Sequence, residues 1–314
     1  MINLNQHFSY QDIVMYLQML ADQFPEFTIY RSIGISHDER EIPMMRIGFG
    51  METLICTAGI HGKENINPPV FLKMIEDYCM AYHAHRLIEG IDVHTLLNQY
   101  SICFIPLLNP DGYEIAMYGF DAIHNQLLRR MCRRSKIHSK DWKYNAKGVD
   151  INRNFPSRSY IQQQLSEYPA SEPETKALIG VFRDYETLAY LDFHSSGNVI
   201  YYYRQAMPYT YNIHCRHLAS ALTRISGFAL GKKEEEFMSS LNGGNSVHFY
   251  SESTGRPAIT VETVKDDASY PLSIAYQSDT YRQIHRMPLA LLRDLRPMGC
   301  YAILPALRNK SFPH

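Results

Sequence analysis

The sequence predicts an α/β domain in which helices cover a mixed sheet, and two observations support this prediction. Short, apolar, unbroken runs recur along the chain, as expected for strands buried on both faces. Longer helical stretches lie between these runs, and such alternation is typical of α/β domains. The 314 residues, 45% of them hydrophobic, suffice for a large core. Because no repeat, low-complexity tract or composition shift interrupts the chain, we expect a single domain over residues 1–314.

The predicted elements follow one another along the whole chain. The predicted strands are Met45–Phe49, Leu54–Ala58, Ser101–Leu107, Leu188–Phe193, Val199–Tyr203 and Ala258–Glu262. The predicted helices are Tyr10–Gln23, Pro69–His83, Asp121–Arg134, Glu172–Asp184, Tyr209–Ile225 and Ser278–Leu295. Ser9 precedes the first helix as its N-cap. Pro69 begins the second, where the missing N–H of proline costs little.

Charge and hydropathy give no sign that the protein binds nucleic acid or a membrane. Lys and Arg number 31 against 32 Asp and Glu, so nothing indicates nucleic acid or a membrane surface. No apolar run approaches the ~20 residues that span a bilayer. The N-terminus lacks the pattern of a signal peptide, so a cytoplasmic location is expected. The oligomeric state cannot be read from the sequence.

The six cysteines are widely spread, and no two of them form a CxxC pair. Cys56 and Cys103 fall inside strand-like runs and are expected to be buried thiols. We therefore expect a reducing compartment and no disulfide framework.

The segment TAGIHGKENINPP, residues 57–69, places a histidine and a carboxylate three positions apart in a loop. His61 and Glu64 follow the predicted strand Leu54–Ala58, and ligands of open α/β sheets bind beyond the carboxyl ends of strands. Both side-chain types bind zinc, and ligands close in sequence chelate it rigidly. A surface His beside a surface Glu gives the same pattern, so the motif alone leaves both interpretations open.

His194 ends the apolar run Leu188–Phe193 and meets a Ser-Ser-Gly turn, so it stands at a strand end as His61 does. Alone, it could instead close the strand through a backbone hydrogen bond. Two histidines and one carboxylate leave a coordination position for water, which is the composition of a catalytic zinc site. We therefore expect one Zn²⁺ per chain, held by His61, Glu64 and His194.

Glu262 is the one acidic residue in the apolar run of the segment PAITVETVKDD. A carboxylate in such a place is costly unless it has a partner or a function. The structural alternative is an ion pair with Lys or Arg. The functional interpretation is a general base that takes a proton from zinc-bound water, with a pKa raised by partial burial.

Asn152 and Arg153 are adjacent in the polar segment NAKGVDINRNFPSRS. The guanidinium fork of Arg matches a carboxylate bidentately, and Asn adds a donor beside it. Asp150 could accept the free N–H of a zinc-bound His and fix its tautomer. The alternative is a turn with local side-chain capping.

Because these segments occur together and in this order, the sequence resembles the zinc carboxypeptidases related to carboxypeptidase A, over roughly residues 8–300. The motifs that carry the resemblance are HGKE (61–64), LLNPDGYE (107–114), GVDINRNFP (148–156), DFHSSG (192–197) and TVET (260–263). It implies a mixed, mostly parallel, twisted sheet with helices on both faces. Carboxypeptidase A is a standard example of a zinc site with two His and one Glu ligand, so this ligand geometry comes with the resemblance.

The resemblance also implies a role for each candidate residue. The zinc ligands match His61, Glu64 and His194, and Glu262 matches the general base. The pair that grips the substrate's terminal carboxylate matches Asn152 and Arg153. Asp150 matches the hydrogen-bond partner of the first His ligand.

One further arginine of the family polarises the scissile carbonyl. The corresponding stretch is MCRRSK, where Arg133 is the candidate, with Arg129 and Arg130 as competitors. It would stabilise the developing oxyanion together with zinc. The interpretation of the charged run RRMCRRSK as a solvated helix face remains open for its other charges.

The expected substrate is a small peptide with a free carboxylate end. Pancreatic members place a Tyr shortly before a Gly-Gly pair, but before Gly243-Gly244 the matching position is Ser239. The family position that contacts the side chain of the substrate's C-terminal residue falls near Ser246. Its small, polar character argues against a plain basic or aromatic C-terminal residue.

The lead-in DWKYNAKGVDINRNFP resembles the bacterial branch that cleaves γ-D-glutamyl–diamino acid bonds of cell-wall peptides. A polar pocket with an acidic residue such as Asp266 or Glu252 nearby would suit the amine and carboxylate of a diaminopimelate. The alternatives are a general peptide carboxypeptidase, an amidohydrolase that deacylates an N-acyl amino acid, and a non-catalytic binding protein.

Overall fold

The structure is a computed structural model that describes residues 1–295 except 164, 166, 237–242 and 267. Its strands are β1 Thr28–Ile35, β2 Glu41–Ile47, β3 Glu52–Thr57, β4 Leu87–Ile88, β5 Ile91–Asp92, β6 Ser101–Ile105, β7 Glu186–Ser195, β8 Val199–Tyr201, β9 Ala229–Leu230 and β10 Ala258–Thr263. Except for the small β4–β5 ladder, these described strands form one sheet in the order β1-β2-β6-β3-β7-β10-β8-β9. Its centre, β6-β3-β7-β10, is parallel.

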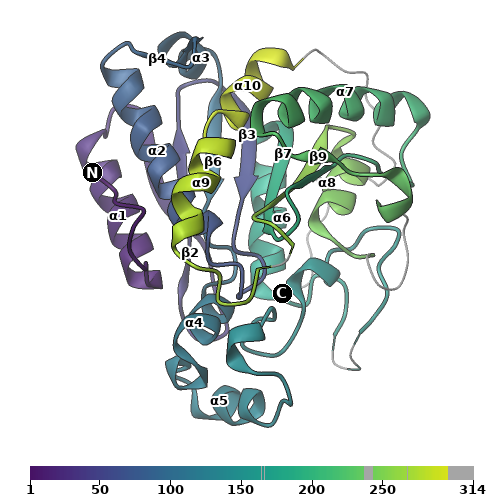
Figure 1. Cartoon of the computed structure of the whole chain (residues 1–314). Coiled ribbons are helices and arrows are strands. Elements are labelled where there is room, and N and C mark those ends of the chain that lie inside the picture. The colour runs from purple at the N-terminus through teal and green to yellow at the C-terminus, as the bar shows by residue number, and fades with distance from the viewer. Residues whose placement is uncertain (164, 166, 237–242, 267, 296–314) are drawn as a thin grey trace.

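The α-helices of the described residues are α1 Tyr10–Gln23, α2 Asn67–His83, α3 Val93–Gln99, α4 Pro110–Tyr118, α5 Gln126–Arg133, α6 Pro173–Asp184, α7 Tyr209–Ser226, α8 Ser246–Thr254, α9 Ala275–Ile284 and α10 Met287–Asp294. Ser9 caps α1 as predicted, since its side chain accepts a hydrogen bond from the Asp12 N–H. In Figure 1, α9 and α10 lie in front of the sheet and α6 behind it, while α4 and α5 form the lower end.

Two hydrophobic cores lie on opposite faces of the sheet, because successive side chains of a strand point to opposite sides. Along β3, Leu54 and Cys56 join one core and Ile55 the other. The first core also contains apolar residues of α1, α2, α7 and α10, and the second contains those of α6 and α8. Helices therefore cover both faces of a mixed sheet, which confirms the predicted fold class.

Two predicted helices have different bounds in the structure. The helix predicted over Ser278–Leu295 is broken into α9 and α10, and Pro288 lies in the first turn of α10, where a helix tolerates it. The helix predicted over Asp121–Arg134 begins later, at Gln126, because the Asn125 side chain caps its first N–H groups. Strand β1 and helices α3, α4 and α8 were not predicted.

Two composition-based expectations concern cysteines and membranes. Cys56 and Cys103 are buried free thiols as predicted, and so are Cys79, Cys132 and Cys215; Cys300 lies outside the described residues. Among the described helices, none combines the length and the apolar character that crossing a membrane requires.

The parallel centre of the sheet brings the predicted site residues to one edge. His194 lies near the end of β7 and pairs in register with Glu262 near the end of β10. The loop that follows β3, the other neighbour of β7, carries His61. Three segments far apart in sequence thus meet at the carboxyl ends of neighbouring strands, as ligand sites of α/β sheets do.

Candidate active site

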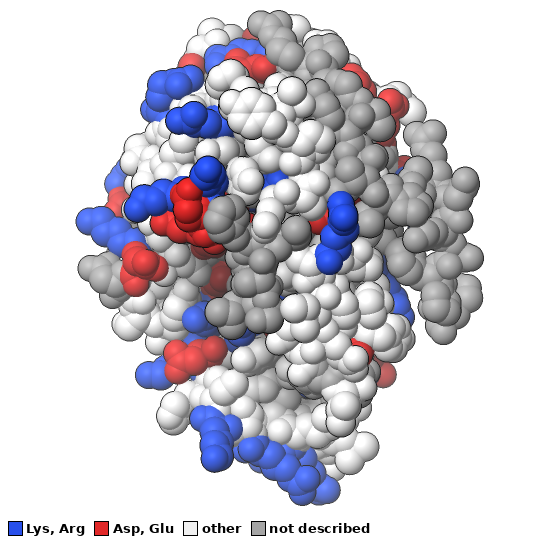
Figure 2. Space-filling model, turned by 90° about the vertical axis from the view of Figure 1, so that its right-hand side faces the viewer, with Lys and Arg blue, Asp and Glu red and all other residues white. Residues whose placement is uncertain are grey.

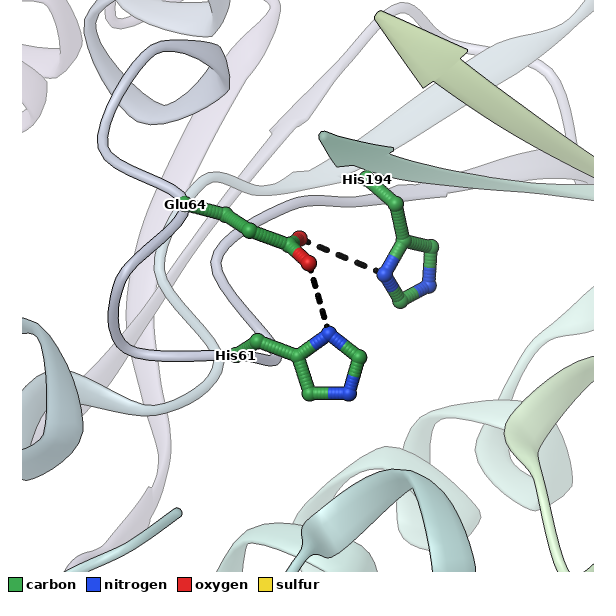
Figure 3. Close-up of side chains that lie close together, drawn as sticks. All are labelled: His61, Glu64 and His194. Carbon is green, nitrogen blue, oxygen red and sulfur yellow. Dashed lines mark hydrogen bonds and ion pairs between the residues drawn. The ribbon is translucent and has the colours of Figure 1, made fainter. Parts of the chain in front are cut away.

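The nitrogen Nδ1 of both His61 and His194 faces the carboxylate of Glu64 (Figure 3). His61 Nδ1 lies 2.7 Å from Glu64 Oε1, and His194 Nδ1 lies 3.3 Å from Glu64 Oε2. One potential ligand atom from each of the three residues lies within 4.8 Å of the others. Two imidazole nitrogens and a carboxylate that converge in this way fit a zinc ion.

These three groups strongly perturb one another. Burial alone would lower the pKa of His61, but the Glu64 and Asp150 carboxylates outweigh burial and raise it to about 9. Burial alone would raise the pKa of Glu64, but the two imidazoles hold it below its usual range. The cluster is therefore polarised for cation binding, with a carboxylate held in its charged form.

The second nitrogen of each imidazole also faces a carboxylate. His61 Nε2 lies 3.4 Å from Asp150 Oδ1, and His194 Nε2 lies 3.1 Å from Asp192 Oδ2. Such partners fix the ring orientation of metal-binding histidines and make them more basic. The structure thus places Asp150 where it was predicted and adds Asp192, which the sequence reasoning missed. Its position two residues before His194 on a strand, on the same face, was the available signal.

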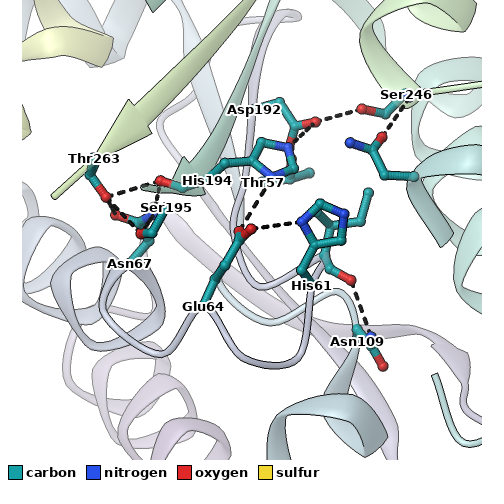
Figure 4. A network of polar contacts seen from close by, with 12 residues as sticks. Thr57, His61, Glu64, Asn67, Asn109, Asp192, His194, Ser195, Ser246 and Thr263 are labelled. Atoms are coloured by element: carbon teal, nitrogen blue, oxygen red, sulfur yellow. Dashed lines mark hydrogen bonds and ion pairs between the residues drawn. The ribbon is translucent and has the colours of Figure 1, made fainter. Parts of the chain in front are cut away.

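A buried hydrogen-bond network fixes these carboxylates and the ligand loop (Figure 4). Asp192 accepts hydrogen bonds from Thr57 Oγ1 at 2.6 Å and Ser246 Oγ at 2.5 Å. Asn67, at the start of α2, donates to the His194 carbonyl at 2.9 Å and accepts from Thr263 Oγ1 at 3.0 Å. The start of α2, which follows the ligand loop, is therefore tied directly to the ends of β7 and β10.

The ligand loop also packs closely against α4. A Cβ atom at Gly62 would lie 2.2 Å from the backbone of Gly112, so only glycine fits between the two metal-ligand candidates. Asn109, the N-cap of α4, donates to the Ile60 carbonyl at 3.1 Å. These contacts explain why the motifs HGKE and NPDG occur together.

Glu262 lines a cavity of about 190 Å³ together with His61 and His194. Burial raises the pKa of its carboxyl group, and the negative charge of Glu64 adds to the effect. Thr260, two residues earlier on β10, faces the same cavity. No ion pair with Lys or Arg involves Glu262 in the described part of the chain.

Asn152 and Arg153 line this cavity too, on the short helix Ile151–Arg153. Asp150 caps that helix by accepting the Asn152 N–H at 3.1 Å. The Asn152 carbonyl oxygen Oδ1 accepts the Ser246 N–H at 3.1 Å. This bond turns the amide N–H₂ of Asn152 away from α8. The structure therefore brings together the predicted ligands, base and carboxylate-binding pair.

Ser246 does not line the cavity, which corrects the role predicted for it. Its side chain is fully buried at the N-terminus of α8, where Oγ donates to Asp192. It therefore supports the partner of His194 and does not read a substrate side chain. Its neighbours Asn245, Val247 and His248 line the cavity in its place.

Arg133 also lies away from the other predicted residues. Its exposed guanidinium pairs with Asp121, and Arg133 lines neither the 190 Å³ cavity nor a neighbouring cavity of about 630 Å³. Arg134 lines that larger cavity together with Asp150 and Arg153. Arg133 is the last residue of α5 and Arg134 its C-cap, so the two side chains leave the helix in different directions. We therefore replace Arg133 by Arg134 as the candidate.

The sequence reasoning also missed a buried ion pair in the wall of the 190 Å³ cavity, between Arg204 and Glu236. Glu236 Oε1 accepts the N–H groups of Tyr202 and Tyr203 at 3.0 and 2.7 Å. Arg204 donates to the Ala258 carbonyl at 2.9 Å, while its Nε has no hydrogen-bond partner among the described residues.

The acidic residues named from the sequence lie elsewhere. Glu252 accepts the Arg158 N–H at 2.8 Å, and Asp266 lines a neighbouring depression; neither lines the 190 Å³ cavity. Ser239, the position that matches the family Tyr, lies outside the described residues. Besides Arg153 and Glu262, the charged residues that line the cavity are Arg204, Glu235 and Glu236.

A second His–carboxylate group, formed by His37, Glu172 and Glu174, also has spacing that could hold a metal. The Asn145 amide donates to Glu172 at 2.7 Å and to Glu174 at 3.2 Å. An N–H donor that points into the group disfavours a cation there. Among the described residues, no such donor points between the ligand atoms of His61, Glu64 and His194, so this group is the better metal site.

A two-His, one-Glu cluster at the strand ends of an α/β sheet, with a carboxylate beside it in a cavity, defines the class of zinc metallopeptidases. The chain belongs to the zinc carboxypeptidase family, whose model matches residues 13–306. This membership confirms the predicted family, the metallopeptidase class and zinc as the metal that the family uses.

Known proteins agree with this assignment. The chain is 25% identical to gamma-D-glutamyl-L-diamino acid endopeptidase 1 of Lysinibacillus sphaericus, over 87% of this chain and 69% of that protein. It spans about half the length of the next two curated relatives that it matches.

Two solved structures share the fold. Bovine thrombin-activatable fibrinolysis inhibitor matches with a TM-score of 0.74 at 19% identity, over 92% of this chain and 97% of that one. Murein-tripeptide amidase MpaA of Escherichia coli O157 matches with a TM-score of 0.52 at 18% identity, over 88% and 95%.

Proposed function

We propose that this chain hydrolyses the amide bond beside a C-terminal diamino acid in a small cell-wall peptide, with zinc held by His61, Glu64 and His194. The observation that carries the substrate class is the Arg204–Glu236 pair in the wall of the cavity beside these ligands. A buried pair of opposite charges favours a substrate group that carries both charges.

The reaction follows from the placement of the side chains. A zinc ion in this site would lower the pKa of its bound water and polarise the scissile carbonyl. Glu262 accepts the proton of the attacking water and passes it to the leaving amine. Asn152 and Arg153 hold the substrate's terminal carboxylate, so that only the last amide bond reaches the ligand cluster.

Arg134 takes the electrostatic role in this scheme. Arg134 lines the cavity that Asp150 and Arg153 also line, and we propose that its guanidinium extends from there towards the acyl side of the scissile bond. A fixed positive charge aimed at the developing oxyanion stabilises the transition state more than the ground state.

Replacing Arg134 by Ala is therefore expected to lower kcat by about 10²-fold, with a smaller change in KM. Arg133→Ala is the matched control, because it removes the same charge one position away on the exposed side of α5. Steady-state kinetics of both variants would measure the difference. Equal losses in the two variants would remove Arg134 from the mechanism.

The leaving residue fits the 190 Å³ cavity at both of its ends. The carboxylate of one end of a diaminopimelate would lie at Asn152 and Arg153. Its far end carries an ammonium and a carboxylate, which complement Glu236 and Arg204. A lysine side chain would bring a cation alone against Arg204, without the carboxylate that complements a guanidinium.

Two relatives support this substrate class through their names. The Lysinibacillus protein is named a γ-D-glutamyl-L-diamino acid endopeptidase, and the Escherichia coli structure a murein-tripeptide amidase. The first name specifies a γ-D-glutamyl-L-diamino acid bond, and the second specifies a murein tripeptide.

A panel of four substrates tests the proposal on zinc-loaded protein. L-Ala-γ-D-Glu-diaminopimelate should be cleaved with a kcat/KM about 10²-fold above that of the peptide with L-Lys in place of diaminopimelate. An N-blocked dipeptide and an N-acyl amino acid should be poorer still. Preference for the blocked dipeptide would indicate a general carboxypeptidase, and preference for the acyl amino acid an amidohydrolase.

A further inference from the structure

A depression of about 340 Å³ adjoins the 190 Å³ cavity, and Tyr201, Glu235 and Glu262 line both. We call it the side depression. The other residues that line it are Ser196, Gly197, Val199, Ala229, Leu230, Lys232 and Asp266. It lies at the β9 end of the sheet, which is the side from which Figure 2 views the molecule. The side depression therefore offers further space directly beside the proposed general base.

Tyr201 stands next to this base on one face of the sheet. It is the last residue of β8 and pairs in register with Thr260 of β10. Paired residues of antiparallel strands carry their side chains on the same face, and so do residues two apart on one strand. The side chains of Tyr201, Thr260 and Glu262 therefore share a face, and all three line the 190 Å³ cavity.

The Tyr201 ring is held in place from the side of β9. A Cβ atom at Gly231 would lie 2.2 Å from Tyr201 Cδ1, so only glycine fits beside the ring. The Gly231 N–H donates to the Ile200 carbonyl at 2.9 Å, which fixes this close approach. Burial and the nearby Glu235 and Glu262 carboxylates raise the pKa of the Tyr201 hydroxyl to about 12. The ring is therefore a fixed and uncharged wall.

This wall lies where the cavity and the side depression would otherwise join. Of the three residues that line both spaces, only Tyr201 is aromatic. Pockets for small molecules usually measure at least about 300 Å³, and the cavity with 190 Å³ is smaller than that. In so small a cavity, a single ring that blocks an adjoining space of 340 Å³ has a large effect on what fits.

We propose that Tyr201 limits the size of the leaving residue, because its ring closes the 190 Å³ cavity against the side depression. This inference rests on the proposed function only in placing the leaving residue in that cavity. It concerns the shape of the cavity and not the charges that bind the residue, so it applies to any leaving side chain. Tyr201→Ala should open the cavity into the side depression, whereas Tyr201→Phe keeps the ring and should keep the limit.

The test compares L-Ala-γ-D-Glu-diaminopimelate with the same peptide benzoylated on the amine at the far end of the diaminopimelate. Wild-type protein should cleave the benzoylated peptide with a kcat/KM at least about 10²-fold lower. Tyr201→Ala should reduce this ratio to about tenfold or less, through a gain on the benzoylated peptide. Because benzoylation removes the same charge in every variant, a change of the ratio between variants reports on space.

Three further variants control this test. Tyr201→Phe should keep the wild-type ratio, since it removes only the hydroxyl. Tyr209→Ala is the matched control for the loss of a tyrosine, because Tyr209 is 79% exposed and lines neither space. If thermal unfolding shows that Tyr201→Ala is not folded, Tyr201→Val provides the same test with a β-branched residue that suits a strand.

The outcomes separate this inference from the proposed function. A lower ratio in Tyr201→Ala, with the wild-type ratio in Tyr201→Phe, would support the inference. An unchanged ratio in Tyr201→Ala, or the same change in Tyr201→Phe, would overturn the inference and leave the proposed function standing. If wild-type protein cleaves neither peptide, the proposed function fails. N-blocked dipeptides that end in Ala or in Trp then decide the inference by the same ratio of a small to a large leaving residue.

Discussion

Glu262→Gln is expected to lower kcat by about 10³-fold while zinc stays bound, because the variant keeps the shape of the side chain but cannot accept a proton. The carboxyl group lies at the end of β10 beside His194, in the cavity that the ligand candidates line. Burial raises its pKa towards the working pH of a base. Steady-state kinetics and metal analysis of the same sample would measure both consequences.

Glu235→Gln provides the matched control for Glu262→Gln. Glu235 lines the same cavity, but its carboxylate accepts an N–H from Lys232 at the exposed rim. Its replacement should leave kcat within about threefold of the wild-type value. Full activity of Glu262→Gln would show that another group is the base. Loss of zinc from that variant would instead make Glu262 a metal ligand.

The sequence predicted the central strands and long helices because burial on both sides leaves a strong pattern. Strand β1 was missed because it lies at the sheet edge and alternates weakly, so it contains no apolar run. Helix α8 was missed for the opposite reason. Its residues are buried almost all round and include many Ser and Thr, so it shows no amphipathic period.

The candidate site could be predicted where its residues lie in short motifs at strand ends. The choice between Arg133 and Arg134 could not, because adjacent helix residues point about 100° apart and only the end of α5 decides which one faces the cavity. Arg204 and Glu236 are 32 residues apart, and the run of three glutamates gives no sign that only Glu236 is buried. Charge pairing across such separations depends on the tertiary structure.

The same limit applies to Ser246 and Asp192, which are 54 residues apart. They meet only because the N-terminus of α8 lies against β7. The sequence analysis assigned Ser246 to the substrate pocket, because a small polar residue stands at the position that contacts the substrate in the family. In the structure its hydroxyl holds Asp192, and through it the His194 ring. The proposed substrate pocket is therefore lined by charged residues that no local motif marks.

Glu64→Gln is expected to abolish zinc binding and reduce activity to background, because it removes the carboxylate on which both Nδ1 atoms converge. Zinc binds the folded wild-type chain, so free zinc at about 100 times Kd should stabilise it by about 2.7 kcal/mol, and the variant by almost nothing. Thermal unfolding with and without zinc, together with metal analysis, measures this. His37→Gln is the matched control at the other His–carboxylate group. Zinc retained by Glu64→Gln but lost from His37→Gln would show that the metal binds at His37, Glu172 and Glu174. That result would contradict the proposed mechanism, which needs zinc beside Glu262.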